Sequence, residues 1–553
     1  MRLHVVKLLL ALLSASSLSE GGACAPPSVR LSNGTYLGVR NEQYAQDFFL
    51  GIPYAQPPLG ALRYAAPQPL NESFEEPRSA KEYGWMCIGY GSDTANLGSP
   101  VSEDCLTINV VRPAGTKPGD NLPVGVWVHG GSYVNGGSLD PRYNLSYIVE
   151  QSVLEGKPIV AASINYRLSY WGFLFGKELQ DDGAGNIGFR DQRLALQWLK
   201  ENVAPFGGSP DKITIWGESA GARSLGMQLI AYDGKHDDLF RSAILQSGSS
   251  VAKFVGADAW QPYFDALVEK TGCAAAGDRL ACLRGLPWQT LNAVFNGSNP
   301  LGVTAPVISA VVDGDFVTAQ ASSLLAEGKF APVPLLLGNN VDEGTGYAKQ
   351  GINTTEQFEA WLASSLLVGA DQIAEISKLY PDDPAVGIPA SFTGRPTDQF
   401  GAQWKRVAAV AGDFQQHTGR RLMASTYAAA GLPVYSYLWN VYVNGLGPIY
   451  GATHFQEVCF VFNNTRGLGY ATNPFGSKPE SYFRLADLMS KMWVSFIHGT
   501  DPNLGGQTAL EWPLYTPQKP DNLVFDANYT NLGYVAEDNY RAVEIAYMQE
   551  HVF

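Results

Sequence analysis

One serine has the surroundings that covalent catalysis requires. Residues 217–221 read Gly-Glu-Ser-Ala-Gly, with Ser219 at the centre. The segment before them, residues 213–216, is apolar, and helical periodicity begins at residue 220. A serine on a tight turn from a strand into a helix is raised above the edge of a sheet, and flanking glycines let the chain turn there. The pattern predicts that Ser219 is a nucleophile.

A serine hydroxyl needs a base to remove its proton, and His454 is the best candidate among the seven histidines. It lies in a loop after an expected strand at residues 434–438. In proteins with this kind of serine turn, the partners follow in the order serine, acid, histidine. His4 lies in the N-terminal leader, His129 beside a glycine pair and His236 in a charged loop. His417 lies in an expected helix, His498 at the end of one and His551 near the end of the chain.

An acid that orients the histidine is expected between Ser219 and His454, just after a strand. Asp342 and Glu343 follow the expected strand at residues 334–337, and both qualify on spacing alone. Backbone N–H groups are also needed, because they stabilise the negative oxygen of a tetrahedral intermediate. The His-Gly-Gly-Ser segment at residues 129–132 is expected to supply two, and Ala220 a third.

These candidates lie at the ends of short apolar strands that alternate with helices. The expected strands are residues 124–128, 159–164, 213–216, 242–245, 334–337 and 434–438, and the expected helices are 190–203, 220–231 and 481–497. Strands that are apolar on both faces are typical of a parallel sheet covered by helices. No repeat or charged linker divides the chain. We therefore expect an α/β fold with a large, mostly parallel central sheet and helices on both faces, in a single domain with long insertions.

Charge and residue spacing exclude several classes of function. The 553 residues carry 38 basic and 52 acidic side chains, a net charge of −14. Nucleic-acid binding is disfavoured, because it requires a basic surface. We expect no metal, since no cysteine–histidine cluster has ligand spacing, and no organic cofactor, since no phosphate-binding loop is present.

The N-terminus and the sequons predict a secreted, extracellular glycoprotein. Residues 1–19 have the basic start, short apolar run and small residues of a signal peptide, which leaves residues 20–553 as the mature domain. The apolar run is too short for a transmembrane anchor, which needs about 20 residues, and no later segment is apolar enough. Seven sequons are glycosylation candidates: Asn33, Asn71, Asn144, Asn296, Asn353, Asn463 and Asn528.

Six cysteines suit an oxidising compartment. Cys87 with Cys105, and Cys273 with Cys282, are close enough in sequence to close short loops. The other two, Cys24 and Cys459, are left over, either as free thiols or as a pair.

Two long motifs resemble the signatures of one family. Residues 206–221 contain Phe-Gly-Gly, four further residues and Ile-Thr-Ile-Trp-Gly-Glu-Ser-Ala-Gly. They resemble the serine signature of the type-B carboxylesterase/lipase family, which includes cholinesterases and fungal lipases. Residues 103–110, Glu-Asp-Cys-Leu-Thr-Ile-Asn-Val, resemble its second signature. The resemblance extends from about residue 49 to residue 503 and is closest to secreted fungal members.

The resemblance implies an α/β-hydrolase fold and an acyl-enzyme mechanism with a Ser219, Glu343 and His454 triad. The family motif Asp-Glu-Gly places the acid at Glu343 rather than Asp342. The resemblance implies that the oxyanion amides are those of Gly131, Ser132 and Ala220. It places two further acids, Glu218 and Glu457, beside the triad. It also implies the disulfides Cys87–Cys105 and Cys273–Cys282.

Departures from the family pattern bear on the substrate. Ser132 stands where the family usually has a third glycine, so the amide remains but its backbone is less free. The first disulfide loop has only 17 residues, rich in Gly, Ser and Asp, and lacks the apolar helix of a lipase lid. Trp85 precedes this loop, whereas the choline-binding tryptophan of cholinesterases lies within it, so acetylcholine is disfavoured.

We therefore expect a small-molecule or lipid-like ester as substrate, with short, medium or bulky esters favoured in an open site. The alternatives are a lipase or sterol esterase for long acyl chains, and an amidase or acyltransferase with the same residues. A non-catalytic cholinesterase-like recognition module is a further alternative, against which the intact triad weighs.

Overall fold

The computed structural model describes residues 26–297, 301–506 and 508–553. The expected signal peptide and Cys24 lie outside these residues. Across the described part of the chain, no helix is both long and apolar enough to cross a membrane.

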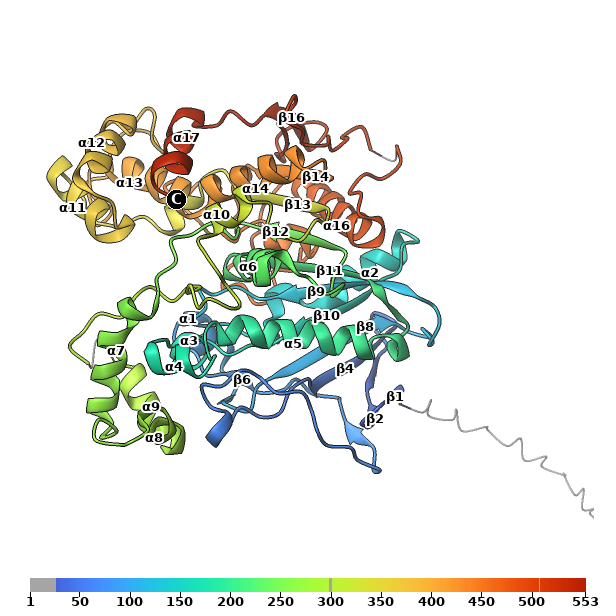
Figure 1. The fold of residues 1–553 in the computed structure, drawn as a ribbon. Helices are drawn as coiled ribbons and strands as arrows, with labels where there is room; N and C mark the ends of the chain where they lie inside the picture. The colour runs from blue at the N-terminus through green and yellow to red at the C-terminus, as the bar shows by residue number, and fades with distance from the viewer. Residues whose placement is uncertain (1–25, 298–300, 507) are drawn as a thin grey trace, which may run out of the picture.

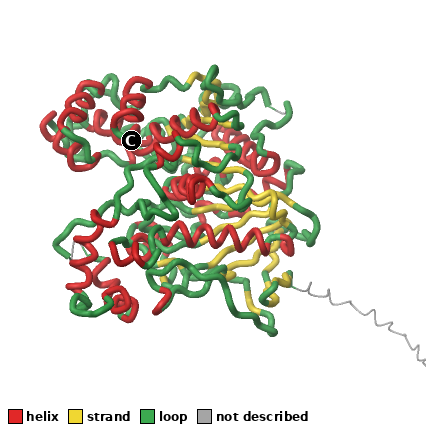
Figure 2. The backbone as a smooth tube through the Cα atoms, in the orientation of Figure 1, coloured by secondary structure: helices red, strands yellow, loops and turns green. Residues whose placement is uncertain are grey.

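An eleven-stranded sheet runs through the centre of the molecule (Figures 1 and 2). Its spatial order is β16 (Gly533–Glu537), β15 (Asp521–Phe525), β14 (Val434–Trp439), β13 (Leu335–Asn340), β12 (Ser242–Gln246), β11 (Gly208–Glu218), β9 (Leu122–Val128), β10 (Val160–Ile164), β8 (Thr107–Pro113), β4 (Gln46–Pro53) and β3 (Val39–Asn41). Neighbours from β15 to β10 pair in parallel, whereas β16, β8, β4 and β3 are antiparallel to their neighbours at the two edges. The expected α/β fold with a mostly parallel sheet is confirmed, and all six expected strands belong to it.

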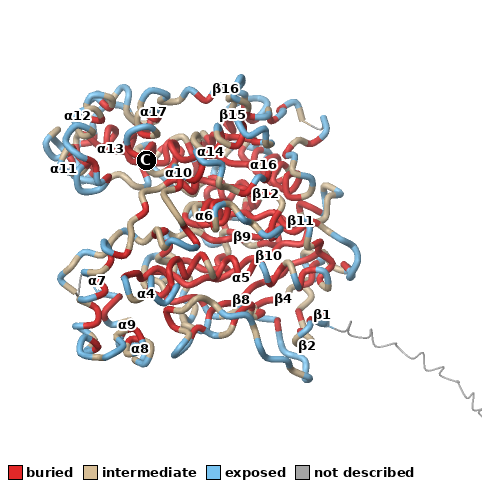
Figure 3. The backbone as a smooth tube through the Cα atoms, viewed as in Figure 1, coloured by how far each residue is buried: buried red, intermediate tan, exposed pale blue. Residues whose placement is uncertain are grey.

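Alternating side chains bury both faces of the sheet. In β9, Val124, Val126 and Val128 pack into one core, whereas Trp127 packs into the other. The first core is covered by α5 (Ile187–Asn202), α6 (Ala220–Gly234), α10 (Ala321–Ala326) and α14 (Thr418–Ala429), and the second by α2 (Leu145–Leu154), α15 (Val458–Val461) and α16 (Glu480–Gly499). Figure 3 shows that burial is concentrated in the strands and in the helices that cover them.

Two groups of helices project beyond the sheet, each with a core of its own (left side of Figure 1). One group is α3 (Ser169–Phe173), α4 (Lys177–Asp181), α7 (Ala257–Lys270), α8 (Arg279–Gly285) and α9 (Trp288–Phe295), and the other is α11 (Thr355–Leu366), α12 (Ala370–Leu379), α13 (Trp404–Gly412) and α17 (Ala542–His551). These groups are the long insertions that the sequence predicts.

The remaining short elements lie outside the large sheet. They are β1 (Ser28–Leu31), β2 (Gly34–Leu37), β5 (Arg78–Ser79), β6 (Met86–Cys87), β7 (Val101–Ser102), α1 (Ser92–Leu97), the 3-10 turns η1 (Gly60–Leu62), η2 (Pro141–Tyr143), η3 (Ala204–Phe206) and η4 (Glu343–Gly346), and the π-helical segment η5 (Asp413–His417).

Both expected cysteine pairs are disulfide-bonded. Cys87 joins Cys105, and Cys273 joins Cys282. Cys459 is a buried thiol without a disulfide partner among the described residues, and its Sγ lies 3.3 Å from the carbonyl oxygen of Gln456.

The topology brings the candidate residues to one edge. β14, β13, β12, β11 and β9 are consecutive and parallel, so their carboxyl ends lie side by side. In open α/β sheets, ligands bind outside the carboxyl ends of such strands.

Candidate active site

The backbone at Ser219 is strained into a sharp turn. β11 ends one residue before it and α6 begins one residue after it. Its φ of 57° and ψ of −125° lie outside the regions that side-chain-bearing residues ordinarily occupy. A Cβ at Gly217 would lie 2.8 Å from the carbonyl oxygen of Val128, and a Cβ at Gly221 only 2.0 Å from the same oxygen. The turn therefore packs so tightly against the end of β9 that both flanking positions require glycine.

His454 connects this serine to a buried glutamate. Its Nε2 lies 2.8 Å from Oγ of Ser219, and its Nδ1 lies 2.6 Å from Oε2 of Glu343. The glutamate side chain is fully buried, whereas that of the histidine is 15% exposed. A neutral imidazole that donates from Nδ1 to a carboxylate presents Nε2 as an acceptor to the hydroxyl. The arrangement is suited to removing the proton of Ser219.

The second carboxylate oxygen of Glu343 accepts hydrogen bonds from two neighbouring residues. Oε1 accepts hydrogen bonds from Oγ of Ser247, at 2.5 Å, and from the backbone N of Asn340, at 2.8 Å. The neighbouring Asp342 is turned away, and its Oδ2 accepts from the backbone N of Ala452 at 2.8 Å. Of the two acids that the spacing leaves open, the structure brings Glu343 to the histidine.

The loop after β9 lies against the serine turn. A Cβ at Gly130 would be 2.7 Å from the carbonyl oxygen of Glu218 and 3.0 Å from Cβ of Ser219. Among the described residues, the backbone amides of Gly131, Ser132 and Ala220 donate to no other protein atom. They are therefore available to an oxygen of a bound ligand.

His129 supports this loop and does not belong to the hydrogen-bonded line of Ser219, His454 and Glu343. It is buried, and its Nδ1 lies 2.8 Å from the carbonyl oxygen of Gly130, so the ring donates from Nδ1. Burial lowers the pKa of His129 to about 4, which keeps the imidazole neutral at neutral pH. The ring stacks on Tyr166, whose hydroxyl donates to the carbonyl oxygen of His129 at 2.9 Å.

Glu218 and Glu457 lie beside the linked Ser219, His454 and Glu343 side chains, at the positions that the resemblance implies. Oε1 of Glu218 is 3.2 Å from Nε2 of His454. Glu457 accepts from Nδ2 of Asn340 at 2.8 Å and from Nε2 of Gln246 at 3.0 Å. Both carboxyls are fully buried, and burial, followed by repulsion from nearby carboxylates, raises the pKa of each. This environment favours their neutral forms and limits the negative charge around the histidine.

Three supporting residues were not predicted from the sequence. Ser247 and Asn340 hold Glu343, and the ring of Tyr347 lies 4.8 Å from that of His454. The first two stand at or just after the ends of expected strands, and that position is the signal that could have indicated them. Tyr347 carries no comparable signal, because its contact depends on how the loops after β13 and β14 meet.

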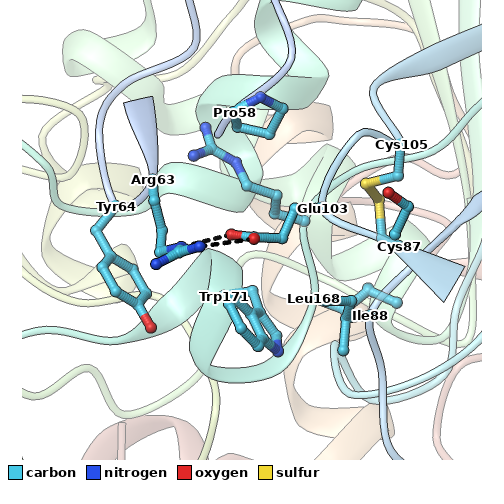
Figure 4. A pocket seen from close by; sticks show the side chains of 11 residues that line it. Pro58, Arg63, Tyr64, Cys87, Ile88, Glu103, Cys105, Leu168 and Trp171 are labelled. Atoms are coloured by element: carbon cyan, nitrogen blue, oxygen red, sulfur yellow. Dashed lines mark hydrogen bonds and ion pairs between the residues drawn. A yellow bond between two sulfur atoms is a disulfide. The ribbon is translucent and has the colours of Figure 1, made fainter. Parts of the chain in front are cut away.

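The Cys87–Cys105 loop is anchored at its base (Figure 4). Glu103 accepts two hydrogen bonds from Arg63, at 2.6 and 2.8 Å, and both side chains are 7% exposed. The same guanidinium donates to the carbonyl oxygens of Leu283 and Leu286 around the end of α8. None of the six residues of α1, which the loop carries, is buried, so α1 presents no apolar core-facing side. No cluster of three potential metal ligands occurs in the described part of the chain.

The fold defines the protein as an α/β hydrolase. The model of the carboxylesterase family matches residues 25–547, and the chain belongs to that family of carboxylic-ester hydrolases.

Relatives match over nearly the whole length. Lipase 4 of Diutina rugosa is 35% identical over 550 residues, which cover 94% of each chain. Secreted lipase 1 of Botryotinia fuckeliana (strain B05.10) is 33% identical over 557 residues, or 95% of this chain and 93% of the relative. The crystal structure of Aspergillus niger EstA superposes with a TM-score of 0.83 at 27% identity, covering 96% of this chain and 99% of that one.

Proposed function

We propose that this protein is a secreted serine esterase that works through an acyl-enzyme with Ser219, Glu343 and His454 as its catalytic triad. The observation that carries the proposal is the unbroken line of hydrogen bonds, 2.8 Å from Ser219 to His454 and 2.6 Å from His454 to Glu343. This geometry is what general-base activation of a hydroxyl requires.

The reaction begins when Nε2 of His454 takes the proton of Ser219 and Oγ attacks the ester carbonyl carbon. The carbonyl oxygen becomes an oxyanion, which accepts hydrogen bonds from the amides of Gly131, Ser132 and Ala220. The intermediate collapses, and the alcohol leaves with the proton from His454. Water then repeats the sequence and releases the carboxylic acid.

Within this proposal, short, medium or bulky esters are the expected substrates. The side chain of His454 is 15% exposed and Ser219 is partly exposed, so the described residues leave the hydroxyl and the imidazole accessible. α1 has no buried residues and is bonded to the neighbouring loop, which argues against a lid that opens at an oil surface. Long-chain lipolysis is the second candidate, because two of the relatives reported above bear the name lipase.

We propose a signal peptide over residues 1–19 and a single catalytic domain over residues 20–553. One of the relatives is named a secreted lipase, and two disulfides suit an oxidising compartment.

Hydrolysis of nitrophenyl esters with acyl chains of two to sixteen carbons tests the function. We expect activity to peak at short or medium chains and to fall by about 10⁶-fold in Ser219→Ala. A peak at the longest chains, or marked activation at a lipid surface, would contradict the preference for short or medium chains and support the lipase alternative. Full activity in Ser219→Ala would contradict the triad. Wild-type protein without activity on any of these esters, and without reaction with a trifluoromethyl ketone, would favour a recognition module.

A further inference from the structure

The carbonyl oxygen of Gly131 accepts three hydrogen bonds. The backbone N of Val134 donates at 3.0 Å, the backbone N of Asn135 at 3.1 Å and the side-chain Nδ2 of Asn135 at 2.8 Å. A carbonyl oxygen has two lone pairs, so three donors on one oxygen fix its direction strongly. The shortest of the three bonds comes from the side chain.

Fixing this oxygen also aims the amide of Ser132. The Gly131 carbonyl and the Ser132 N–H belong to one planar trans peptide unit, in which the two groups point in opposite directions. Gly131, Ser132 and the next residue, Tyr133, have φ angles of 109°, 56° and 62°, three successive left-handed values. Residues with side chains adopt such angles only when their surroundings hold them there. The donors on the Gly131 oxygen are therefore part of what fixes the direction of the Ser132 N–H.

The other end of the Asn135 amide is also held. Its Oδ1 accepts from the backbone N of Asp93 at 3.1 Å, and Asp93 lies in α1 of the Cys87–Cys105 loop. One end of the amide faces a carbonyl oxygen and the other faces an N–H, so only this orientation satisfies both neighbours. Asn135 thus joins the disulfide loop to the peptide that carries the Ser132 amide.

We infer that Asn135 is a positioning residue of the oxyanion hole, through which the Cys87–Cys105 loop holds the Ser132 N–H in its productive direction. The inference rests on the proposed function, because it assumes that this amide stabilises an oxyanion. Asn135 itself touches neither substrate nor the reacting atoms. Its effect should therefore appear in the chemical step and not in substrate binding.

Two substitutions of Asn135 distinguish repulsion of the Gly131 carbonyl oxygen from simple loss of the side-chain hydrogen bonds. Asn135→Asp keeps the size of the side chain and an acceptor for Asp93, but it sets an oxygen against the Gly131 carbonyl. Asn135→Ala removes both arms and leaves the two backbone donors in place. Removing an oxyanion donor costs about 10²- to 10³-fold in kcat, and a misdirected donor costs part of that. We expect kcat to fall by about 10- to 100-fold in Asn135→Asp and less in Asn135→Ala, with KM within about twofold of wild type.

Thr94→Val is the matched control. Oγ1 of Thr94 accepts from the backbone N of Gly136 at 3.3 Å, in the same contact between the two loops, and this bond does not reach the Gly131 carbonyl. We expect kcat of Thr94→Val to stay within about twofold of wild type, because no oxyanion donor is redirected. An equal loss in Thr94→Val and Asn135→Asp would assign the effect to general loosening of the loop and overturn the inference.

A transition-state analogue supplies a readout that loosening alone does not move. A trifluoromethyl ketone is attacked by Oγ of Ser219, whose proton passes to His454, and its carbonyl oxygen becomes an oxyanion. The inhibition constant for this ketone should rise in parallel with the fall in kcat/KM, while that of the product carboxylate stays constant. Wild-type kcat and ketone affinity in both Asn135 variants would overturn the inference and leave the triad standing. Wild-type protein that neither hydrolyses esters nor binds the ketone would instead overturn the proposed function and the inference with it.

Discussion

Oε2 of Glu343 lies 2.6 Å from Nδ1 of His454, although 111 positions separate the two residues in the chain. The carboxylate next to it, that of Asp342, faces the backbone of Ala452 instead. Two adjacent acids thus have separate partners, and this difference can be tested directly.

Exchanging each acid for its amide separates the two roles. We expect Glu343→Gln to lower kcat by about 10³- to 10⁴-fold, because the amide neither stabilises the imidazolium nor holds the required tautomer. Asp342→Asn keeps an acceptor for the Ala452 N–H and should retain kcat within a few-fold. Steady-state kinetics on one nitrophenyl ester measures both. Similar losses in the two variants would contradict the assignment of the acid to Glu343.

The two disulfides should differ in their effect on catalysis. Each closes a short loop, with sequence separations of 18 and 9, and each contributes about 3 kcal/mol to the free energy of unfolding by chain entropy. Replacing Cys87 and Cys105 by serine should also lower kcat several-fold, because that loop holds Asn135 through Asp93. Replacing Cys273 and Cys282 should lower stability alone. Denaturant melts with kcat measurements distinguish the cases, and equal kcat values in the two double variants would contradict this link.

His417 should make the protein sensitive to acid. Its ring is fully buried, both nitrogens lack a hydrogen-bond partner among the described residues, and its pKa is lowered well below 6.5. The causes are burial first and then repulsion from Arg541, Arg420 and Arg421, while Asp538 acts in the opposite direction.

The sign of this effect follows from the lowered pKa. Below pH 6.5 the imidazole of His417 is protonated in the unfolded chain but stays neutral in the folded protein. The free energy of unfolding therefore falls as the pH falls from 6.5 toward the pKa of His417 in the folded protein. Between pH 7 and pH 5, wild type should lose about 2 kcal/mol more of its free energy of unfolding than His417→Gln does. Denaturant melts at the two pH values measure the difference. Parallel losses in the two proteins would show that His417 binds its proton equally well in both states.

The folded structure distinguishes the sequons. Four have exposed asparagines, namely Asn71, Asn296, Asn353 and Asn528. In contrast, Nδ2 of Asn463 donates to Oε1 of Gln151 at 3.2 Å. A glycan is bulky and needs solvent around Nδ2.

We therefore expect glycans at the four exposed sites in protein secreted from a eukaryotic host, and none at Asn463. Mass mapping of glycopeptides before and after enzymatic deglycosylation checks this, with Asn353→Gln as a control for one site. A fully occupied Asn463 would contradict the prediction for that site.

Local features of this chain were predictable because their causes are local. The six strands and three helices expected from apolar patterning are all present, since side-chain alternation and helical periodicity depend on near neighbours. The serine turn was predictable for the same reason, because strand, glycines and helix occupy one short stretch of sequence. The other five strands of the sheet, β3, β4, β8, β15 and β16, were not predicted from that patterning. The two outermost strands, β3 and β16, are short and partly exposed, which weakens the pattern there.

By itself, therefore, the sequence determined which serine stands on a strained turn, which histidine follows in the right order and that a mostly parallel sheet supports them. Only the tertiary structure decided which partners these residues meet. Ser247 reaches Glu343, and Asn135 reaches both Gly131 and Asp93, because strand order brings loops from distant parts of the chain to one edge of the sheet. Spacing along the chain left Asp342 and Glu343 equivalent, and the physical reason is that adjacent residues in a loop point in different directions. Their orientations depend on the backbone N–H groups and hydroxyls that the folded neighbours supply.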